Sequence, residues 1–407
     1  MSAPAAGARD AGLGPRARRA RTRVLQLSVV HAADDPRIFE RECRTLRDAG
    51  FDVTYAVPAP VPGRVRSGVK LVALPQRSRR LRWTQWAPIT ALVARLRPHV
   101  VHVHDPELLT LLPALRPLVP RVVYDMHEYH SLDFASKYYV PEPLRPHAAR
   151  AVAAAQRTLA GMVDGVVVVV EEQLELLGPL PTLRVALPNY PRCSRFEHAV
   201  PLPELAADPR LKLVHVGSLT RNRGITVMLD VLQKLADHGP ADDPSADVVL
   251  YLGGRYYNPR FEAEVRARAA DLGSDRVRLL GRIAPDDLPR YLASADVVWS
   301  PELATAQYQR PTVPTKLFEG MATGLAVLAS ELPGRAELVG ELACGLTVEP
   351  GVDGHLAGLD RLRADRPETA RMGARGRQAV RERYSWEIIE DRLIDFYERL
   401  CEGLPVD

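Results

Sequence analysis

The sequence contains few cysteines and no long apolar segment. Its cysteines are Cys43, Cys193, Cys344 and Cys401. They stand far apart and form no Cys-x-x-Cys pair, which argues against a zinc site and a disulfide framework and suits a reducing cytoplasm. The longest apolar run, residues 165–170, has the length of a strand rather than of a membrane span. We therefore expect a cytoplasmic protein, with any membrane contact peripheral and at the inner face.

Large apolar side chains are almost absent from residues 1–22, which are mainly Ala, Gly, Pro and Arg. Such a segment buries too little apolar surface to offset the cost of ordering, so we expect a disordered basic tail and no secretory signal. The net charge of +4 and the pI near 8.9 fit an anionic substrate or a membrane surface. No aromatic-rich basic motif interrupts the arginines, so we expect no nucleic-acid partner.

Strand and helix patterns alternate along the chain and restart near its middle. At 407 residues the chain is longer than one hydrophobic core usually covers, so we expect two domains. Apolar runs at 23–30 and 51–57 flank a helical pattern, which predicts an opening β-α-β unit. Asp35 before Pro36 is the expected N-cap of that helix. After a proline-containing polar stretch at 201–209, a strand pattern at 211–216 begins the same order again. We therefore predict an α/β protein of two doubly wound, Rossmann-like domains that face each other across a ligand cleft.

Polar residues follow two predicted strands of the first domain. The strand at 100–107 ends in His104, Asp105 and Glu107, and the strand at 121–130 ends in a similar cluster around His127. Ligands of open α/β sheets bind at the carboxyl ends of strands. A single histidine after a strand is more often structural than catalytic, and these histidines match no metal-ligand spacing. The pattern predicts a polar site without a metal.

The stretch from Pro314 to Ser330 reads as a short helix, a glycine turn and a buried strand. Lysine is scarce in this chain, yet Lys316 stands in the first turn, where a cation and free backbone N–H groups can hold a phosphate. One turn later, Glu319 can accept hydrogen bonds from sugar hydroxyls, or it merely complements the helix dipole. It lies four residues after Thr315 rather than the three of a capping box, which favours a site.

Five motifs in this order resemble the family 4 glycosyltransferases of the GT-B fold. They are Asp34 to Phe39 with Glu42, then residues 101–109, 123–128, 217–224 and 314–324. The resemblance spans roughly residues 23–400. It implies a nucleotide-sugar donor in a C-terminal domain at 201–384, an acceptor in an N-terminal domain at 23–200, and a last helix at 385–407 that crosses back to the first domain. It also implies transfer with retained configuration, without a metal or another cofactor.

The same resemblance assigns roles to single residues. His127 is expected to be the catalytic histidine that touches the donor sugar, Glu319 to hold the nucleotide ribose, and Arg223 to contact the diphosphate. The donor-binding set is Gly217, Arg221, Arg223, Arg282, Thr315, Lys316, Leu317 and Glu319; the acceptor-side candidates are Asp35, Arg37, Asp105, Glu107, Glu128 and Tyr129. As the bond to the nucleotide breaks, negative charge grows on the diphosphate, so fixed cations stabilise the transition state more than the ground state.

Three positions depart from the family pattern. Pro311 stands where the first Glu of the Glu, seven residues, Glu motif is expected, so the reading of the donor sugar passes to the loop at 302–315. Ser218 replaces an arginine of the phosphate turn, for which Arg221 could compensate. The Gly-Gly that usually follows the first strand is replaced by Ala32 to Asp35.

The main prediction is a hexosyl- or N-acetylhexosaminyltransferase that uses a UDP- or GDP-type donor and a small-molecule, glycan or lipid-linked acceptor. The alternatives are a non-catalytic nucleotide-sugar-binding partner subunit, a sugar-nucleotide epimerase of the same fold, and a phosphorylase with pyridoxal phosphate on Lys316. The segment from Trp83 to Leu96 reads as an amphipathic helix with basic ends, either an ordinary surface helix or a docking face for an anionic membrane or an acceptor.

Overall fold

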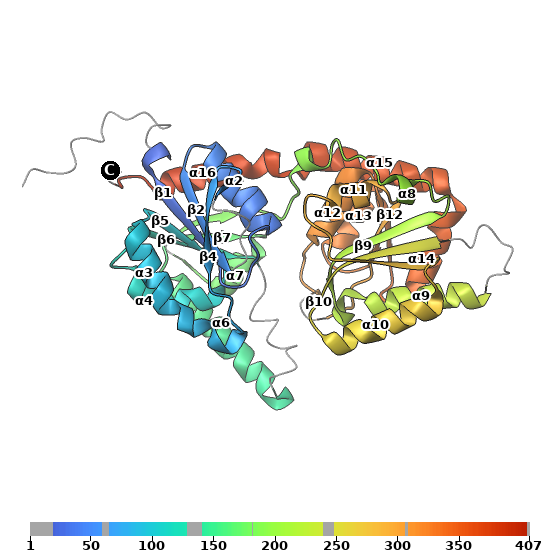
Figure 1. Ribbon diagram of the computed structural model, residues 1–407, viewed down its shortest axis with the longest axis horizontal. Coiled ribbons are helices and arrows are strands. Elements are labelled where there is room, and N and C mark those ends of the chain that lie inside the picture. The colour runs from blue at the N-terminus through green and yellow to red at the C-terminus, as the bar shows by residue number, and fades with distance from the viewer. Residues whose placement is uncertain are drawn as a thin grey trace, which may run out of the picture. The chain divides into compact units, whose positions relative to one another are not determined.

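The computed structural model describes residues 19–58, 65–127, 141–180, 182–238, 248–305 and 308–404. The chain forms two compact units (Figure 1). Unit 1 runs to Asn189 and resumes at Ile389, and unit 2 comprises Tyr190–Ile388. Each unit contains one sheet covered by helices, which confirms the predicted α/β class with two parallel-sheet domains. The division between the units precedes the predicted boundary at 200/201. Most of the predicted tail lies outside the described residues.

The sheet of unit 1 has the order β3-β4-β2-β1-β5-β6-β7-β8. Its strands are β1 (Arg23–Leu27), β2 (Asp52–Pro58), β3 (Val65–Arg66), β4 (Val69–Leu74), β5 (Val100–Val103), β6 (Arg121–Met126), β7 (Gly165–Val168) and β8 (Leu183–Ala186). Only β3 pairs antiparallel, with β4, among these strands. The parallel arrangement explains why the central strands are nearly continuous apolar runs, since both of their faces are buried.

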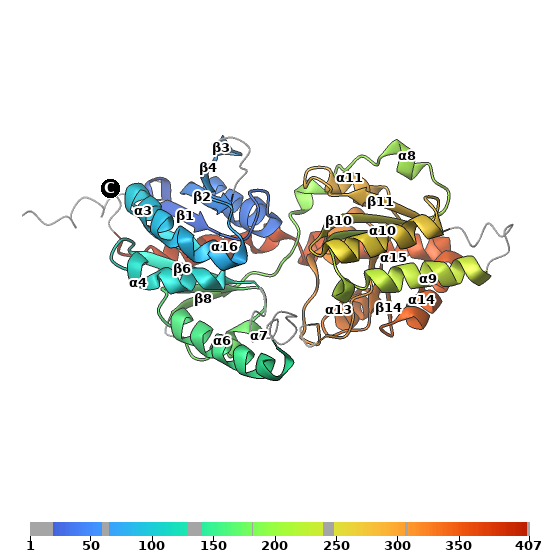
Figure 2. The ribbon, with the colours of Figure 1, turned by 60° about the horizontal axis from the view of Figure 1, so that its bottom comes forward.

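Helices cover both faces of this sheet (Figures 1 and 2). The helical segments are η2 (Pro36–Cys43), α2 (Arg44–Asp48), η3 (Arg79–Gln85), α3 (Trp86–Leu96), η4 (Pro106–Leu111), α4 (Leu112–Leu115), η5 (Glu142–Leu144), α6 (Arg145–Ala160), α7 (Glu172–Leu177) and the end of α16 (Trp386–Leu400). Apolar residues of α3, α4 and α6 pack on one face, for example Ile89 against the β1 and β5 side chains. The α16 residue Tyr397 lies on the other face, where the Gln26 side-chain amide of β1 donates to its Oη at 3.2 Å.

The helical segment that follows β1 is a π-helix, not the α-helix that the sequence pattern suggests. It begins where expected, because Asp35 caps it: its Oδ1 accepts from the N–H groups of Arg37 at 2.9 Å and Ile38 at 3.0 Å. A π-helix hydrogen-bonds residues five apart. Arg37 and Glu42 have this separation, and the Nε of Arg37 lies 3.4 Å from Oε1 of Glu42. The wider helix thus places two charged side chains on one buried face.

The sheet of unit 2 is entirely parallel across its described strands, in the order β11-β10-β9-β12-β13-β14. The strands are β9 (Leu211–Leu219), β10 (Val248–Tyr256), β11 (Val277–Gly281), β12 (Val297–Ser300), β13 (Ala326–Ser330) and β14 (Gly345–Val348). The helical segments are η6 (Cys193–Arg195), α8 (Pro203–Ala206), η7 (Arg221–Arg223), α9 (Ile225–His238), α10 (Pro259–Leu272), α11 (Leu288–Ala293), α12 (Thr315–Thr323), α13 (Arg335–Leu342), α14 (Val352–Ala364) and α15 (Arg366–Arg383). Helices α9, α10 and α14 pack on one face and α11, α12, α13 and α15 on the other (Figure 2).

Strand β9 continues through Leu219, although the sequence pattern predicts a turn from residue 217. Gly217 pairs with Gly254 of β10. A Cβ added to Gly254 would lie 1.8 Å from the carbonyl oxygen of Gly217, so the two backbones approach more closely than side chains permit. Glycine therefore extends the strand pair here rather than ending it.

Candidate functional site

The histidine predicted to be catalytic lies at the carboxyl end of β6 in unit 1. His127 is nearly buried, with 9% of its side chain exposed, and its Nδ1 lies 3.6 Å from Oδ2 of Asp125. Its Nε2 lies 3.1 Å from Nε2 of His31, whose Nδ1 lies 2.9 Å from Oδ2 of Asp35. A carboxylate can only accept, so Nδ1 of His31 carries the proton that it shares with Asp35. Between the two Nε2 atoms, one ring donates and the other accepts.

The Asp35 carboxylate stays ionised in this arrangement. Burial alone raises its pKa, but His31 and the backbone N–H of Ile38 more than offset burial and hold the pKa well below its usual range. The site can therefore hold and move a proton between two imidazoles that carboxylates orient.

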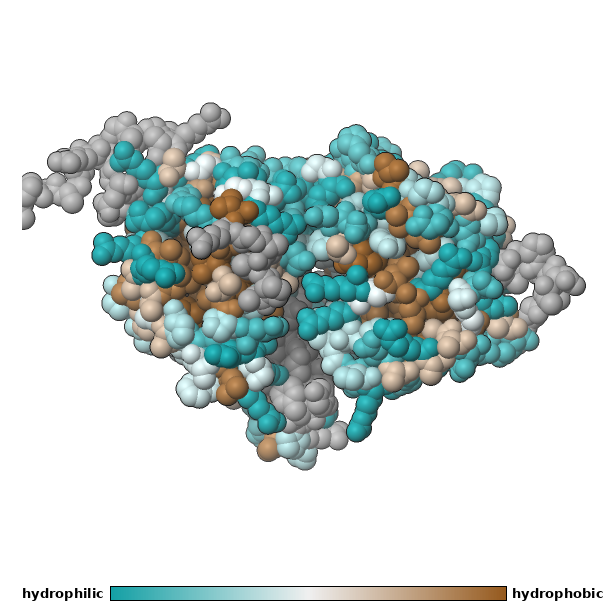
Figure 3. Space-filling view, in the orientation of Figure 1, coloured by the Kyte–Doolittle hydropathy of each residue, from teal (hydrophilic) through white to brown (hydrophobic). Residues whose placement is uncertain are grey.

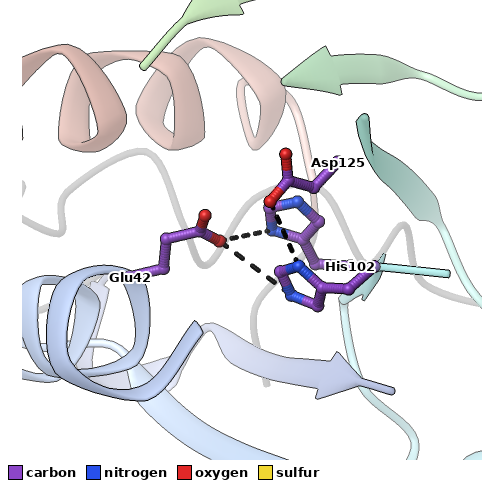
Figure 4. Close-up of side chains that lie close together, drawn as sticks. Glu42, His102 and Asp125 are labelled. Carbon is purple, nitrogen blue, oxygen red and sulfur yellow. Dashed lines mark hydrogen bonds and ion pairs between the residues drawn. The ribbon is translucent and has the colours of Figure 1, made fainter. Parts of the chain in front are cut away.

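Beneath His127, a cluster of buried ionisable side chains is centred on Arg37. The guanidinium donates from Nε to Oδ2 of Asp125 at 2.7 Å and from Nη2 to Oδ1 at 2.9 Å. The Nδ1 of His104 lies 3.2 Å from the same Oδ2. His102 stacks on His104, and Glu42 approaches both histidines, with its Oε2 3.7 Å from Nδ1 of His102 (Figure 4). These side chains hold Asp125 in place, and Asp125 orients His127.

This cluster is also the part of the described chain that comes nearest to a metal site. One ligand atom each from Glu42, His102, His104 and Asp125 lies within 4.8 Å of the others. Arg37, however, already engages both Asp125 oxygens. Burial and the neighbouring Asp125 raise the pKa of Glu42 well above its usual value, which weakens it as an anionic metal ligand. A divalent ion would have to displace Arg37, which favours an arginine–carboxylate cluster.

Most acceptor-side candidates make hydrogen bonds or ion pairs within unit 1. Asp35 contacts His31, and Arg37 contacts Asp125. Asp105 is buried and accepts from Ser28 Oγ at 2.9 Å and from the backbone N–H of Val29 at 2.6 Å, so it shapes the loop after β1. Glu107 is partly exposed and pairs with Arg82 at 2.7 Å. The other two candidates, Glu128 and Tyr129, lie outside the described residues.

In unit 2, cations from three elements surround Glu302, which follows β12 and is fully buried. The Nζ of Lys316 in α12 lies 3.1 Å from its Oε1, and Nη1 of Arg223 in η7 lies 3.3 Å from the same atom. The Nε of Arg335, the first residue of α13, lies 3.9 Å from Oε2, to which Ser300 Oγ donates at 2.5 Å. The cluster reaches solvent through Arg223, with 28% of its side chain exposed, and Lys316, with 12% exposed.

Glycine at one turn makes this arrangement feasible. Gly224 ends η7 with a φ of +74°, and a Cβ there would lie 1.8 Å from the carbonyl oxygen of Pro301. The turn therefore lies directly against the segment after β12, and the backbone N–H of Leu303 donates to the carbonyl of Asn222 at 3.0 Å. This close approach places Arg223 next to Glu302.

The charges of the cluster do not balance. Three cations face one carboxylate, and although burial alone raises the pKa of Glu302, Lys316, Arg335 and Arg223 together lower it below the usual range. Burial lowers the pKa of Lys316 to about 8, and Arg223 adds to this effect, while Glu302 opposes it. Excess positive charge at the carboxyl end of a parallel strand is an arrangement that binds anions.

The remaining donor-side candidates fall into two groups. Thr315, Lys316, Leu317 and Glu319 share α12, but Leu317 is fully buried in the core, so only its backbone remains for a ligand. Glu319 is 8% exposed. Gly217 lies within β9, and Arg282 is exposed after β11. Arg221 is not part of the cation cluster, because it pairs with Glu264 of α10 and lies over the Phe261 ring.

The sequence patterns did not identify Arg335, and they placed Glu302 only as the first residue of a loop. Arg335 follows Pro333 and Gly334 after a buried strand, where a charged residue reads as an exposed helix start. Its full burial becomes evident only when Tyr308 and Glu302 are in place around it. The roles of His31 and Asp125 likewise depend on contacts between separate strand ends.

No helix in the part of the chain that the structure describes is long and apolar enough to cross a membrane. Figure 3 shows hydrophilic side chains over much of the visible surface of each unit, with smaller hydrophobic patches between them. Two large hydrophobic side chains of η3 are exposed, Leu81 at 49% and Trp83 at 65%.

Comparisons with known proteins agree with the motifs. A family model described as Glycosyltransferase Family 4 matches residues 37–180, and one described as Glycosyl transferases group 1 matches residues 210–365. The alpha-maltose-1-phosphate synthase of Mycobacterium tuberculosis strain H37Rv is 29% identical over 212 residues, 49% of this chain and 51% of that protein. The amylovoran biosynthesis glycosyltransferase AmsK of Erwinia amylovora is 27% identical over 193 residues, 47% of this chain and 45% of that protein. The chain thus spans about half the length of these curated relatives.

Solved structures share the fold over nearly the whole chain. The sucrose-phosphate synthase of Thermosynechococcus elongatus has a TM-score of 0.72 at 17% identity, covering 93% of this chain and 99% of that one. Anabaena Alr3699/HepE, in complex with UDP and glucose, has a TM-score of 0.70 at 15% identity, covering 93% and 100%. The solved structures show that the fold is GT-B. The two family models, which together match most of the chain in both units, show that the chain belongs to the family 4 glycosyltransferases.

Proposed function

We propose that the protein is a retaining glycosyltransferase that moves a hexosyl or N-acetylhexosaminyl group from a UDP- or GDP-type sugar donor to an acceptor hydroxyl. The observation that carries this proposal is the excess of cations around Glu302 in unit 2. A nucleoside diphosphate is the leaving group whose growing negative charge such fixed cations stabilise. We propose that these side chains make a bound metal or another cofactor unnecessary.

In unit 1, His127 is the proposed catalytic residue. Its Nε2 faces Nε2 of His31, and Asp125 and Asp35 lie beside the Nδ1 atoms of the two rings. A ring held in this way in a nearly buried site can contact the transferring sugar. The pair can also take up the proton that the acceptor hydroxyl releases.

The relatives support both types of nucleotide. The GDP-mannose-dependent alpha-(1-6)-phosphatidylinositol monomannoside mannosyltransferase of Mycobacterium tuberculosis strain H37Rv is 31% identical over 154 residues, 37% of this chain and 39% of that protein. The HepE structure contains UDP and glucose. We therefore keep both UDP and GDP donors in the proposal.

The acceptor is proposed to be a small molecule, a glycan or a lipid-linked sugar. The exposed Leu81 and Trp83 of η3 stand among exposed arginines, including Arg79 and Arg80. Apolar side chains among cations suit the surface of an anionic bilayer. We propose a cytoplasmic enzyme that contacts the inner membrane face peripherally through η3.

Thermal-shift measurements with UDP, GDP and their sugar conjugates test the donor assignment, because a ligand that binds the native state raises the melting temperature. A shift with one nucleotide family, followed by turnover of its sugar conjugate with an acceptor, is the expected result. Nucleotide binding with neither donor hydrolysis nor transfer would instead favour the non-catalytic partner subunit. Pro311, which stands where the family has a glutamate, is the observation that supports this alternative. No shift with any nucleotide would contradict the proposal.

A further inference from the structure

Arg335 is an unusual residue for a protein interior. Its side chain is fully buried, yet none of its three guanidinium nitrogens has a hydrogen-bond partner among the described residues. Its contacts are the Glu302 carboxylate, 3.9 Å from Nε, and the Tyr308 ring, whose centroid lies 5.4 Å from Cζ. Burying a cation without hydrogen bonds is costly, so such a group in a native structure calls for an explanation.

Fold stability does not explain this arginine. Glu302 already has Lys316 and Arg223 near one oxygen and Ser300 on the other. A third cation is not needed to neutralise one carboxylate. Burial lowers the pKa of Arg335, and Arg223 adds to this effect, while Glu302 opposes it.

The position of Arg335 connects it with the loop that should read the donor sugar. The preceding Gly334 has a φ of +81°, and a Cβ on it would lie 2.9 Å from the backbone N of Thr312 and 3.2 Å from the carbonyl carbon of Pro311. The family pattern has a carboxylate at position 311, which accepts hydrogen bonds from neutral hydroxyls. This chain has no acceptor side chain there, and the residue that follows Gly334 carries a guanidinium with five donors and no acceptor.

We propose that Arg335 is an oxyanion-binding residue of the donor site. Its planar fork matches a phosphate or a carboxylate, and binding one would supply the hydrogen bonds that it lacks. Two groups of a nucleotide-sugar donor have this chemistry: the diphosphate, and the carboxylate of a uronic acid. Glu302 serves as the internal counter-ion that keeps the three cations together until the ligand arrives. This inference rests on the proposed function for the identity of the donor, but not for the presence of an oxyanion site.

The test compares Arg335→Met with the wild type and with Arg266→Met, which removes an exposed arginine from α10 of the same unit. Dissociation constants are measured for inorganic pyrophosphate, UDP, GDP, UDP-glucose, GDP-mannose and UDP-glucuronate, together with the melting temperature of the ligand-free proteins. Replacing an unpaired buried ion by an apolar side chain is often neutral or stabilising. We therefore expect ligand-free Arg335→Met to melt at or above the wild-type temperature while binding anions roughly 10-fold or more weakly, the loss of a charge-assisted hydrogen bond. Arg266→Met should change neither quantity.

The ligands separate the two sources of the oxyanion. Weaker binding of pyrophosphate and of every nucleotide would identify the diphosphate, whereas weaker binding of UDP-glucuronate alone would identify a sugar carboxylate. Wild-type affinity of Arg335→Met for all ligands would overturn the inference and leave the proposed function standing. The wild-type protein could also bind pyrophosphate through Arg335 but bind no nucleotide. That result would overturn the proposed function and leave the oxyanion site standing.

A second variant covers the case in which Arg335→Met does not fold. Arg335→Lys keeps the charge but replaces the planar fork by one ammonium group. A folded Arg335→Lys protein with weakened anion binding supports the inference. A reduced melting temperature together with wild-type anion affinity would show a purely structural arginine and overturn it.

Discussion

The Nζ of Lys316 lies 3.1 Å from Oε1 of Glu302, and both side chains are largely buried. The carboxylate keeps the lysine charged, while burial and the neighbouring arginines act against that charge. A lysine balanced in this way responds to ligand binding and to pH over a range in which an exposed lysine does not.

Nucleotide affinity should fall as the pH rises above 8. The pKa of Lys316 is lowered from 10.5 to about 8, so the side chain is charged below that pH and loses its proton above it. Each further pH unit should weaken the binding of a nucleoside diphosphate up to about tenfold, because binding then requires uptake of a proton. Calorimetric titration at pH 7, 8 and 9 checks this. Lys316→Arg should flatten the profile, and a flat profile in the wild type would contradict the prediction.

Acid should destabilise unit 2 between about pH 6.5 and pH 4. The Trp299 indole N–H donates to Nδ1 of His355 at 3.2 Å, and Nε2 of His355 lies 3.0 Å from Ser330 Oγ, so the ring is held neutral. Burial lowers its pKa from 6.5 to about 4. Below pH 6.5 His355 takes up a proton in the unfolded chain but stays neutral in the folded one. Stability is therefore lost as the pH falls towards 4, by up to about 3 kcal/mol.

Urea unfolding at pH 7.5 and pH 5 measures this loss. His355→Gln should be less stable at pH 7.5, because the bonds to Trp299 and Ser330 are disturbed, but it should lose less stability between the two pH values. An equal loss in the wild type and the variant would remove His355 as the source.

Replacement of His127 should strongly lower turnover without changing the affinity for the nucleotide. We expect His127→Ala to lower turnover on the order of 100- to 10,000-fold, the usual contribution of a positioned acid or base, while the nucleotide dissociation constant stays near the wild-type value. His147→Ala, which removes an exposed histidine from α6, is the control. Unchanged turnover in His127→Ala would end its assignment.

Glu319→Gln should weaken nucleotide binding rather than slow the chemical step. A carboxylate that accepts from ribose hydroxyls forms charge-assisted bonds, so the isosteric amide should weaken nucleotide binding roughly tenfold. Glu341→Gln, on the exposed side of α13, should bind normally. Wild-type affinity of Glu319→Gln would exclude it from the ribose role.

The turn at Gly224 should not accept a side chain. In Gly224→Ala the added Cβ would lie 1.8 Å from the Pro301 carbonyl oxygen, and the φ of +74° is unfavourable for alanine. The backbone must shift to remove both problems, which moves Arg223 away from Glu302. We expect a loss of at least about 2 kcal/mol in stability and weaker nucleotide binding. Gly273→Ala has a similar φ of +86° but open space around the added Cβ, so it should show only the smaller backbone cost in urea unfolding. Equal losses in both variants would contradict the close-contact argument.

The class and order of the elements follow from the amino-acid sequence alone. Alternating apolar runs and helical periodicity depend on neighbours in the chain, so they predicted parallel sheets and strands such as β4 within Val69–Leu74. The cap at Asp35 could also be predicted, because a cap involves residues two and three positions away. The π-helix that follows could not, since it is set by the buried contacts of Arg37 rather than by local propensity.

Which charged groups come into contact depends on how the separate elements pack together. Lys316, Arg223 and Arg335 come from three separate elements, and their common contact with Glu302 depends on the order in which the strands of unit 2 are assembled. The same holds for His31 after β1 and for Asp125 and His127 at the end of β6, because β5 lies between these two strands in the sheet of unit 1. Local sequence specifies helices and strands, because these arise from contacts between near neighbours. The pKa of a buried lysine or the tautomer of a histidine is set by charges that are distant in the sequence and close in space.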